Sequence, residues 1–190
     1  MPSLAFEPRT YNRPECVVFL KTKELWGELS NMAADFPIRI HNVKYLTAEA
    51  LYQACRFPHL PEVQQLIIDQ ASPMVAKMKS KPYRSRSRVD WDSVRVEVMR
   101  WCLQMKLAQH YSEFGRILLA TKQRDIVEQS ARDPFWGAKE TSATTLHGQN
   151  VLGHLLVDLR EKLKVDSGRA LTKVPVPTVP NMLFFGRQIV

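Results

Sequence analysis

The strongest constraint on the fold is a long amphipathic segment that begins at Asp90 and ends at about His110. Its apolar residues recur at i, i+3 and i+4, so they share one face of an α-helix, and that face is expected to pack on a core. These positions are Trp91, Val94, Val98, Trp101, Cys102, Met105 and Ala108. A second helix is predicted after Asn150, with its leucines on one side. A chain with two such helices must be largely helical.

Shorter patterns predict the other elements. Helices are expected over about 48–57, 61–70 and 112–119, and from 73 into the segment that follows. Thr47 and Ser72 are typical N-cap residues, and Pro58 would stop the first of these helices. Runs of β-branched and aromatic residues predict a strand at 16–21, a hairpin of 36–40 with 43–46, and a short strand or turn at 125–128. We therefore predict an α+β, predominantly helical single domain with a small antiparallel sheet.

The two ends of the chain differ in character from its middle. We predict an N-terminal extension over 1–15, a folded domain over 16–165 and a proline-rich C-terminal arm over 166–190. The arm contains Pro175, Pro177 and Pro180, followed by Leu183, Phe184 and Phe185. This spacing of prolines favours an extended segment, which we expect to lie on the surface, anchored by the two phenylalanines.

Composition excludes several classes of protein. The chain has 27 Lys and Arg against 19 Asp and Glu, and its formal net charge of +8 indicates a polyanionic partner. No apolar run is long enough for a transmembrane helix, and the first residues lack the features of a signal peptide. The three cysteines are widely spaced and the five histidines show no paired spacing, which argues against a disulfide framework or a metal site. We predict a cytoplasmic protein with no membrane contact, no metal and no cofactor.

The segment between residues 77 and 88 is rich in cations and contains no acid. The cations are Lys77, Lys79, Lys81, Arg84, Arg86 and Arg88. Such a cluster can neutralise several phosphates and bind nucleic acid of any sequence through the release of counterions. It is equally consistent with a solvated loop that only aids solubility, or with a site for the phosphates of a small nucleotide.

The first predicted helix carries polar side chains that suit neither a core nor a simple surface. Glu49, Tyr52, Gln53 and Arg56 are three or four residues apart and therefore share one side, which suits a polar pocket. Glu49 alone has a simpler explanation, since an acid in the first turn stabilises a helix electrostatically. Cys55 is a candidate nucleophile or, more simply, a small buried thiol.

Two loops and one turn add further candidates. The candidate residues in the loops are Trp26, Ser30, Asn31, Asp133, Trp136 and Gly137. Either tryptophan also suits an ordinary core position. Gly148 and Asn150 precede the last helix and are typical of a turn whose free N–H groups attract phosphate, and equally of ordinary helix capping.

Taken together, these segments resemble the NADAR family, also called YbiA-like. The matching segments are FLKTKELWGELSNM (19–32), YLTAEALYQACRF (45–57), SPMVAKMKS (72–80), DWDSVRVEVMRWCLQMKLAQH (90–110), LLAT (118–121), DPFWG (133–137) and GQNVLGHLLVDLREKL (148–163). They follow the family's order and spacing. The sequence departs from the common pattern at Met32, where an aromatic residue is usual, and at Val151, where many members have a basic residue.

The resemblance implies an N-glycosidase that acts on bonds between ribose and a base. One branch of the family cleaves early riboflavin-pathway intermediates, and another removes ADP-ribose from guanine bases in nucleic acid, reversing a DarT-type toxin. The resemblance places Glu49, Asp133 and Lys21 among the catalytic candidates. The expected substrate-binding residues are Trp26, Ser30, Asn31, Tyr52, Gln53, Arg56, Trp91, Trp136, Gly137, Gly148 and Asn150.

The chemistry of this bond fits these side chains. Its cleavage develops positive charge at the anomeric carbon, which a carboxylate stabilises, and the departing base needs a proton. We expect Glu49 to act as acid/base and Asp133 to bind ribose or stabilise the charge, while Trp136 or Trp26 stacks on a base. In a partly apolar site the amine of Lys21 would attack the anomeric carbon and form an imine; otherwise it would bind phosphate.

The cation cluster favours the nucleic-acid branch. We expect the protein to remove ADP-ribose from guanine bases of DNA and to act as the antitoxin of a DarT-type ADP-ribosyltransferase. Its partners would be ADP-ribosylated DNA and, functionally, such a toxin. Two alternatives stay open: an N-glycosidase of riboflavin intermediates, and a non-catalytic module that binds ADP-ribose.

Overall fold

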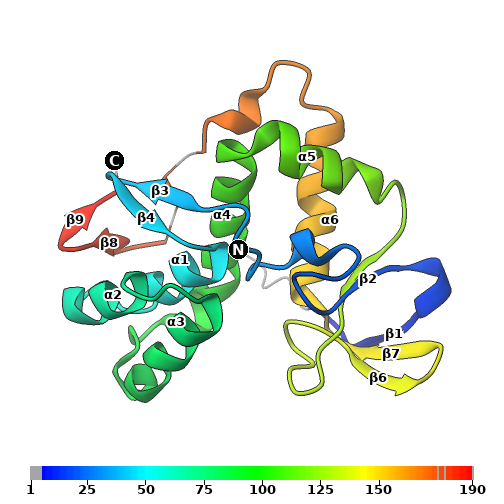
Figure 1. The fold of residues 1–190 in the computed structure, drawn as a ribbon, viewed down its shortest axis with the longest axis horizontal. Coiled ribbons are helices and arrows are strands. Elements are labelled where there is room, and N and C mark those ends of the chain that lie inside the picture. The colour runs from blue at the N-terminus through cyan, green and yellow to red at the C-terminus, as the bar shows by residue number, and fades with distance from the viewer. Residues whose placement is uncertain (1–5, 175, 178, 190) are drawn as a thin grey trace. The chain divides into compact units, whose positions relative to one another are not determined.

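The computed structural model describes residues 6–174, 176–177 and 179–189 (Figure 1). Helices dominate and the sheets are small, which confirms the predicted α+β, predominantly helical class. The chain divides into two compact units. Unit 1 comprises the chain up to Ser30 together with Ser112–Gly168, and unit 2 comprises Asn31–Tyr111 together with the chain from Arg169 onward. Pro175 lies outside the described residues.

Unit 1 contains a small antiparallel sheet and a parallel strand pair. The sheet has the order β1 (Arg9–Asn12), β7 (Thr145–Gly148), β6 (Lys139–Ser142). The parallel pair is β2 (Val17–Phe19) with β5 (Ile126–Glu128), so the segment at 125–128 is a strand and not a turn. The helical elements are η1 (Arg13–Glu15), η2 (Gly27–Leu29), most of α5 (Tyr111–Ala120) and α6 (Val151–Lys164). Strand β1 shows that part of the predicted N-terminal extension is built into this unit.

Helix α6 supplies much of the apolar core of unit 1. Its buried leucines are Leu152, Leu155, Leu156, Leu159 and Leu163, as the spacing predicted. The helix packs against β5, whose Ile126 and Val127 are also buried. The parallel pair and α6 therefore form one packed block.

Unit 2 is built around helix α1 (Ala48–Cys55), every residue of which is buried. It packs against α2 (Pro61–Ile68), α3 (Pro73–Ser80) and the long helix α4 (Trp91–Gln109). The remaining elements are the hairpin β3 (Ile38–Ile40) with β4 (Val43–Tyr45), η3 (Lys81–Arg86), η4 (Ala170–Thr172) and the pair β8 (Leu183–Phe184) with β9 (Arg187–Gln188). Polar side chains of α1 are therefore enclosed by three other helices.

Local sequence explains how several of these elements begin. The hydroxyl of Thr47 accepts a hydrogen bond from the N–H of Ala50 at 3.1 Å, which confirms it as the N-cap of α1. His41 and Asn42 both have positive φ, as the two central residues of a tight hairpin turn require. Ser72 occupies the N-cap position of α3 and Pro73 its first turn, as predicted, although among the described residues the side chain of Ser72 makes no capping hydrogen bond.

The C-terminal arm enters the core of unit 2. Phe184 is buried, with its ring centroid 5.6 Å from that of Tyr45 and 6.3 Å from that of Trp101. Phe185 is only half-buried and has a φ of 51°, so it turns the chain between β8 and β9. One phenylalanine, and not two, anchors the arm.

None of the described helices combines the length and the apolar character needed to cross a membrane.

Candidate active site

Glu49 is the centre of a buried polar cluster in unit 2. Its Oε2 accepts a hydrogen bond from Asn31 Nδ2 at 2.6 Å, and its Oε1 accepts one from Gln53 Nε2 at 2.9 Å. The ammonium of Lys77 lies 3.5 Å from the same Oε1. Glu49 is only 4% exposed, yet three donors surround its carboxyl group.

The partners of Glu49 are themselves held in place. The hydroxyl of Ser80 donates to the backbone carbonyl of Lys77 at 2.8 Å and lies 3.4 Å from Gln53 Oε1. The backbone carbonyl of Asn31 accepts the N–H of Glu49 at 2.8 Å. Glu49 also lies in the first turn of α1, where the helix dipole stabilises a negative charge. The carboxylate is thus fixed from several directions.

Trp91, at the start of α4, lies beside the other polar residues of α1. Its ring centroid is 4.9 Å from that of Tyr52, and the guanidinium of Arg56 lies 5.0 Å from it. Arg56 also donates from Nε to the hydroxyl of Ser87 at 2.6 Å. Burial raises the pKa of Tyr52 well above its usual value, so its phenol stays neutral. Because Trp91 is buried and already covered by these side chains, it shapes the site more than it offers an open stacking surface.

Unit 2 therefore brings together six of the residues predicted from the sequence. They are Asn31, Glu49, Tyr52, Gln53, Arg56 and Trp91. Three residues in contact with this group had no predicted role there: Lys77, Ser80 and Ser87. Their only sequence signal was their place in a segment where cations alternate with serines.

Lys21 does not have the surroundings that the imine hypothesis required. Its side chain is 72% exposed and its ammonium lies 2.8 Å from Glu24 Oε1. The hydrogen bond that Lys21 donates to Glu24 raises the pKa of Lys21, whereas a nucleophilic amine needs a lowered pKa. In this structure Lys21 is solvated and paired with Glu24, and its catalytic role stays a prediction.

Trp26 and Ser30 lie around the short helix η2 in unit 1. Trp26 is half-buried with a φ of 64°, and the guanidinium of Arg124 lies 5.6 Å from its ring centroid. It lines a small cavity of about 210 Å³ together with side chains of α5. Ser30 is buried at the end of η2.

Asp133 and Trp136 belong to a tight turn of unit 1. The Oδ1 atom of Asp133 accepts the N–H groups of Phe135 at 3.1 Å and of Trp136 at 3.0 Å. Asp133 is exposed and Trp136 half-buried. A Cβ atom added at Gly148 would lie 2.5 Å from the carbonyl oxygen of Gly137, so the close approach of these two glycines is structural. One oxygen of Asp133 is thus committed to the turn.

Asn150 is buried, and the fold uses both ends of its side chain. Oδ1 accepts the N–H of Glu128 at 3.0 Å, and Nδ2 donates to the carbonyl of Ile126 at 2.8 Å. The side chain thereby pairs with the backbone of β5 as a neighbouring strand would. Its φ of 48° allows α6 to start directly after it. This accounts for Asn150 without a ligand.

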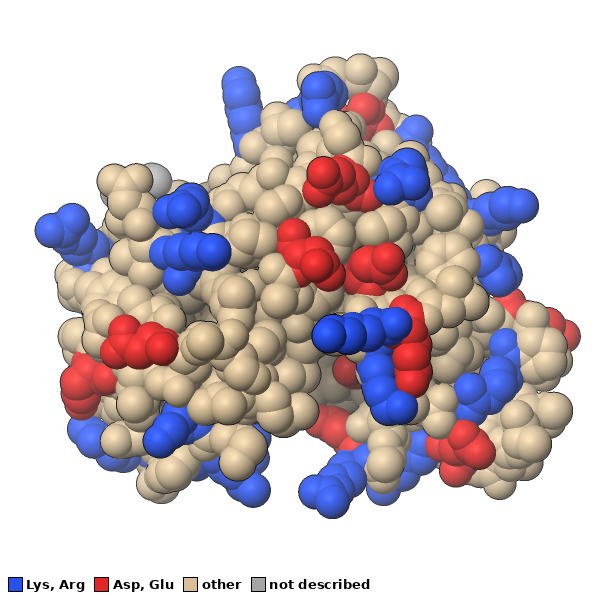
Figure 2. Space-filling view, in the orientation of Figure 1, with Lys and Arg blue, Asp and Glu red and all other residues tan. Residues whose placement is uncertain are grey.

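The cation cluster divides into exposed and engaged residues. Lys79, Lys81, Arg84 and Arg86 are exposed, with Arg86 Nη2 3.6 Å from the carboxylate of Glu62. Arg88 is buried, paired with Asp90 at 2.6 Å, and it donates to the carbonyl of Pro180 at 2.6 Å. Arg88 is therefore part of the fold and is not available to a nucleic acid. On the face shown in Figure 2, basic and acidic side chains are interspersed over the surface.

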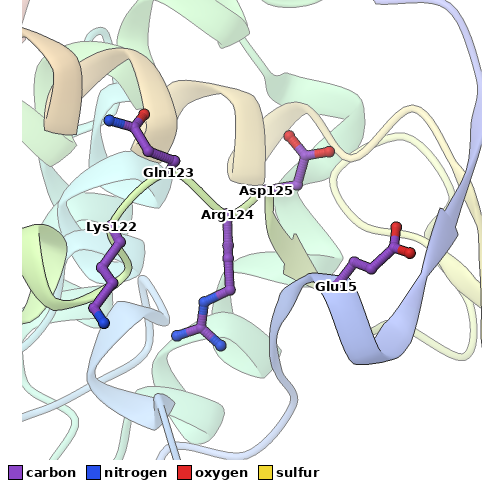
Figure 3. Close-up of a pocket in the computed structure, with 5 residues that line it drawn as sticks. All are labelled: Glu15, Lys122, Gln123, Arg124 and Asp125. Atoms are coloured by element: carbon purple, nitrogen blue, oxygen red, sulfur yellow. The ribbon is translucent and has the colours of Figure 1, made fainter.

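A separate open depression lies in unit 1 and was not predicted. It has a volume of about 830 Å³ and is lined by Glu15, Lys122, Gln123, Arg124 and Asp125. Figure 3 shows Lys122 and Arg124 extending to the same side of their loop, with Glu15 contributed by η1. Acids and bases are mixed along it, so it does not select a ligand of one charge. Within the described part of the chain, His, Cys, Asp and Glu nowhere gather in groups of three that would hold a metal ion.

Several known proteins are similar to this chain in sequence and fold. The model of the NADAR domain family matches residues 18–164. N-glycosidase YbiA of Escherichia coli (strain K12) is 34% identical over 151 residues, which cover 78% of this chain and 88% of YbiA. Riboflavin biosynthesis protein VVA0006 of Vibrio vulnificus is 30% identical over 164 residues, 85% of this chain and 42% of that protein. The NMR structure of E. coli YbiA matches with a TM-score of 0.67 and 32% identity, over 80% of this chain and 88% of that one.

Proposed function

The chain belongs to the NADAR domain family and is an N-glycosidase, and we propose that its substrate is guanine-linked ADP-ribose on DNA. The reaction would release ADP-ribose and restore the unmodified base. The proposal further makes the protein a cytoplasmic antitoxin to a DarT-type ADP-ribosyltransferase. In that role it needs only the modified DNA, without physical contact with the toxin.

The observation that carries the choice of DNA is the position of the exposed cations relative to Glu49. Lys77 on α3 faces Glu49, and the same helix continues through Lys79 into η3, where Lys81 and Arg84 are exposed. A polyanion bound along α3 and η3 would therefore pass close to the buried carboxylate. An enzyme for a small metabolite does not need such a surface beside its reactive group.

The environment of Glu49 supports one half of its predicted acid/base role. Its carboxyl group would accept a proton from the water that attacks the anomeric carbon. The bond from that carbon to the guanine nitrogen breaks, and its electron pair leaves with the base, which takes up a proton from solvent water. Before that point the negative charge of Glu49 stabilises the positive charge that develops on the ribose.

A second candidate function is favoured by the names of two relatives. Riboflavin biosynthesis protein VVA0006 contains a region similar to this chain, and N-glycosidase YbiA is similar over most of its length. The same Glu49 chemistry would cleave the N-glycosidic bond of a riboflavin-pathway intermediate. This candidate predicts no salt-dependent binding of oligonucleotides.

The test is incubation of the purified protein with an oligonucleotide that carries ADP-ribosyl-guanine, followed by mass spectrometry of the released ADP-ribose. We expect release by the wild type and a loss of about 10²–10⁴-fold in kcat for Glu49→Gln, with binding of the oligonucleotide retained. Glu113→Gln, an exposed acid on α5, is the matched control and should keep full activity. Cleavage of riboflavin-pathway intermediates, without release of ADP-ribose from the oligonucleotide, would instead support the second candidate. Turnover by Glu49→Gln at the wild-type rate would remove Glu49 from the mechanism.

A further inference from the structure

We propose that a pocket between the C-terminal arm and the start of α4 binds an unpaired base of the DNA strand, near the nucleotide that carries ADP-ribose. The inference rests on the proposed function, because it concerns how that substrate is held. It adds a specificity-determining site that does not include Glu49.

The pocket lies within unit 2 and has a volume of about 420 Å³. Pockets that bind small molecules have volumes of about 300–1,000 Å³, so this one is large enough for a nucleobase. Its apolar residues are Pro58, Val89 and Leu183, and its polar residues include Ser87, Asp90 and Asn181. Apolar walls with a few polar groups among them suit a flat ring that carries hydrogen-bonding groups on its edge.

The C-terminal arm completes this pocket. Asn181 and Leu183 lie beyond residues 18–164, the region that the family model matches. Arg88 ties the arm to the opposite wall, since it donates to the carbonyl of Pro180 at 2.6 Å and pairs with Asp90. The pocket is therefore built into the fold, and two of its lining residues come from outside the family region.

Val89 lies at the open edge of the pocket. It is fully exposed, although it lines the pocket together with Pro58 and Leu183. A base that entered would remove the surface of this valine from water, which is favourable for an apolar side chain. The same base would contact the other two apolar walls.

The charge beside the pocket indicates what its ligand is attached to. Ser87 lines the pocket directly after η3, and its hydroxyl donates to the carbonyl of Arg84 at 2.6 Å. The exposed cations Arg84 and Arg86 therefore precede the pocket by at most three residues. A nucleotide of a single strand combines an apolar ring with phosphates on both sides, and this arrangement suits both parts.

Ser87 also connects the pocket to the candidate active site. Its hydroxyl accepts a hydrogen bond from Arg56 Nε at 2.6 Å, and the guanidinium of Arg56 lies 5.0 Å from the ring centroid of Trp91. A strand whose base occupies the pocket therefore passes the polar side chains of α1. This places the bound base close, along the strand, to the modified guanine.

Asp90 gives the pocket a preference among bases. Its two carboxylate oxygens accept hydrogen bonds from Arg88 Nε at 2.6 Å and Nη2 at 2.9 Å, which fixes the carboxylate. Each oxygen has a further lone pair, so the group can accept an N–H of an exocyclic amino group. Cytosine, adenine and guanine carry such a group and thymine does not. We therefore expect the pocket to disfavour thymine.

The first measurement is methyl NMR of the whole protein with unmodified single strands of equal length, composed either of deoxycytidine or of abasic units. The methyl resonances of Val89, identified by their absence in Val89→Ser, should shift with the deoxycytidine strand because the ring current of a base acts on them. They should stay in place with the abasic strand, which has the same phosphates. Val165 is the control, an exposed valine of unit 1 whose resonances should not shift with either strand. Equal shifts of Val89 with both strands would overturn the proposal.

The second measurement is the affinity of the same strands by fluorescence anisotropy. Val89→Ser should weaken the binding of the deoxycytidine strand by about fivefold and leave that of the abasic strand unchanged, whereas Val165→Ser should change neither. The wild type should bind the deoxycytidine strand about tenfold more tightly than a thymidine strand. Equal affinity for these two strands would overturn the role of Asp90, and wild-type affinity in Val89→Ser would overturn the pocket itself.

Unmodified strands separate this inference from the proposed function, because their binding needs no catalysis. A wild type that binds none of the strands would overturn both the DNA substrate and the pocket. Binding without a shift at Val89 would overturn the pocket alone, and a shift at Val89 in a protein that releases no ADP-ribose would overturn the proposed function alone. An equal shift with free ADP-ribose would assign the pocket to the adenine of the substrate and contradict the proposal.

Discussion

The side-chain carbonyl of Gln64 accepts a hydrogen bond from the backbone N–H of Phe185 at 2.8 Å. The amide nitrogen of the same side chain donates to the carbonyls of Leu183 at 2.9 Å and Ala54 at 3.2 Å. One fully buried side chain thus joins the β8–β9 hairpin to α1 and α2. The hairpin lies beyond residues 18–164, the region matched by the family model, yet it is bonded to the helix that carries Glu49.

We expect Gln64→Leu to lower the free energy of unfolding by about 2 kcal/mol, because it leaves buried backbone groups without partners. Gln65→Leu is the matched control, since Gln65 is exposed on the same helix, and it should change stability by about 0.5 kcal/mol or less. Urea denaturation of both variants decides the point. Equal stability of the two would mean that the arm contributes nothing through Gln64.

Asn150→Ala should destabilise the protein by about 2–3 kcal/mol, because it removes two buried hydrogen bonds and leaves a left-handed residue without its side chain. Asn150→Asp retains the acceptor for Glu128 but places an oxygen against the carbonyl of Ile126, and it should also be less stable than the wild type. Thermal unfolding without ligand is the measurement. Wild-type stability of both variants would mean that Asn150 does not stabilise the fold and acts only on a ligand.

The exposed cations of α3 and η3 should control the binding of oligonucleotides. Replacement of Lys79, Lys81 and Arg84 by serine should reduce the slope of log affinity against log salt by about 2 for a single-stranded oligonucleotide. Serine at Lys23, Lys44 and Lys162, which are equally exposed, removes the same charge elsewhere and serves as the control. Fluorescence anisotropy over a range of salt concentrations measures both. An equal decrease of this slope in the two triple variants would mean that net charge, and not the position of the cations, controls the binding of oligonucleotides.

The stability of unit 1 should depend on pH through His154. Burial, and next the charge of Arg9, lowers the pKa of this imidazole below its ordinary value, and its Nε2 lies 3.2 Å from the hydroxyl of Tyr11. An unfolded histidine titrates near pH 6.5, so as the pH falls below about that value the unfolded chain binds the proton more readily than the folded one. The contribution of neutral His154 is therefore present above about pH 6.5 and is lost as the pH falls through the folded pKa.

Urea denaturation at pH 7.5 and 5.5 measures this effect. His154→Gln should narrow the difference in stability between the two pH values, since glutamine does not titrate. His59→Gln, at an exposed position, should leave the difference as in the wild type. A wild-type pH dependence in His154→Gln would show that other groups are responsible.

The helices could be predicted because their apolar faces repeat locally. The expected helix from Asp90 to His110 corresponds to α4, and the capped helix after Thr47 corresponds to α1. Strands β6 and β7 gave no such signal: every residue of β6 is exposed, and β7 buries Leu146 and Gly148 alone. Their pairing with β1 depends on residues far apart in the sequence, which a local pattern does not contain.

Residue spacing predicted the part of the site that lies on one helix, whereas Asn31 and Trp91 were predicted from the resemblance to the family. Spacing placed Glu49 and Gln53 on one side of α1, and the structure joins them by a hydrogen bond. Spacing within the cation cluster contains no information on which lysine faces a carboxylate from another helix. Lys77 and Arg88 therefore appeared equivalent to Lys79, although the structure gives each a different partner.

The segment with the exposed cations is a short helix, η3, that is tied at both ends. Ser80 before it bonds to Gln53, and Arg88 after it is held by Asp90 and Pro180. An unstructured basic loop would lose backbone conformational entropy, about 1–2 kcal/mol per residue, on binding a polyanion. Here that loss is incurred during folding, so association of the cations with phosphates costs mainly the ordering of their own flexible side chains.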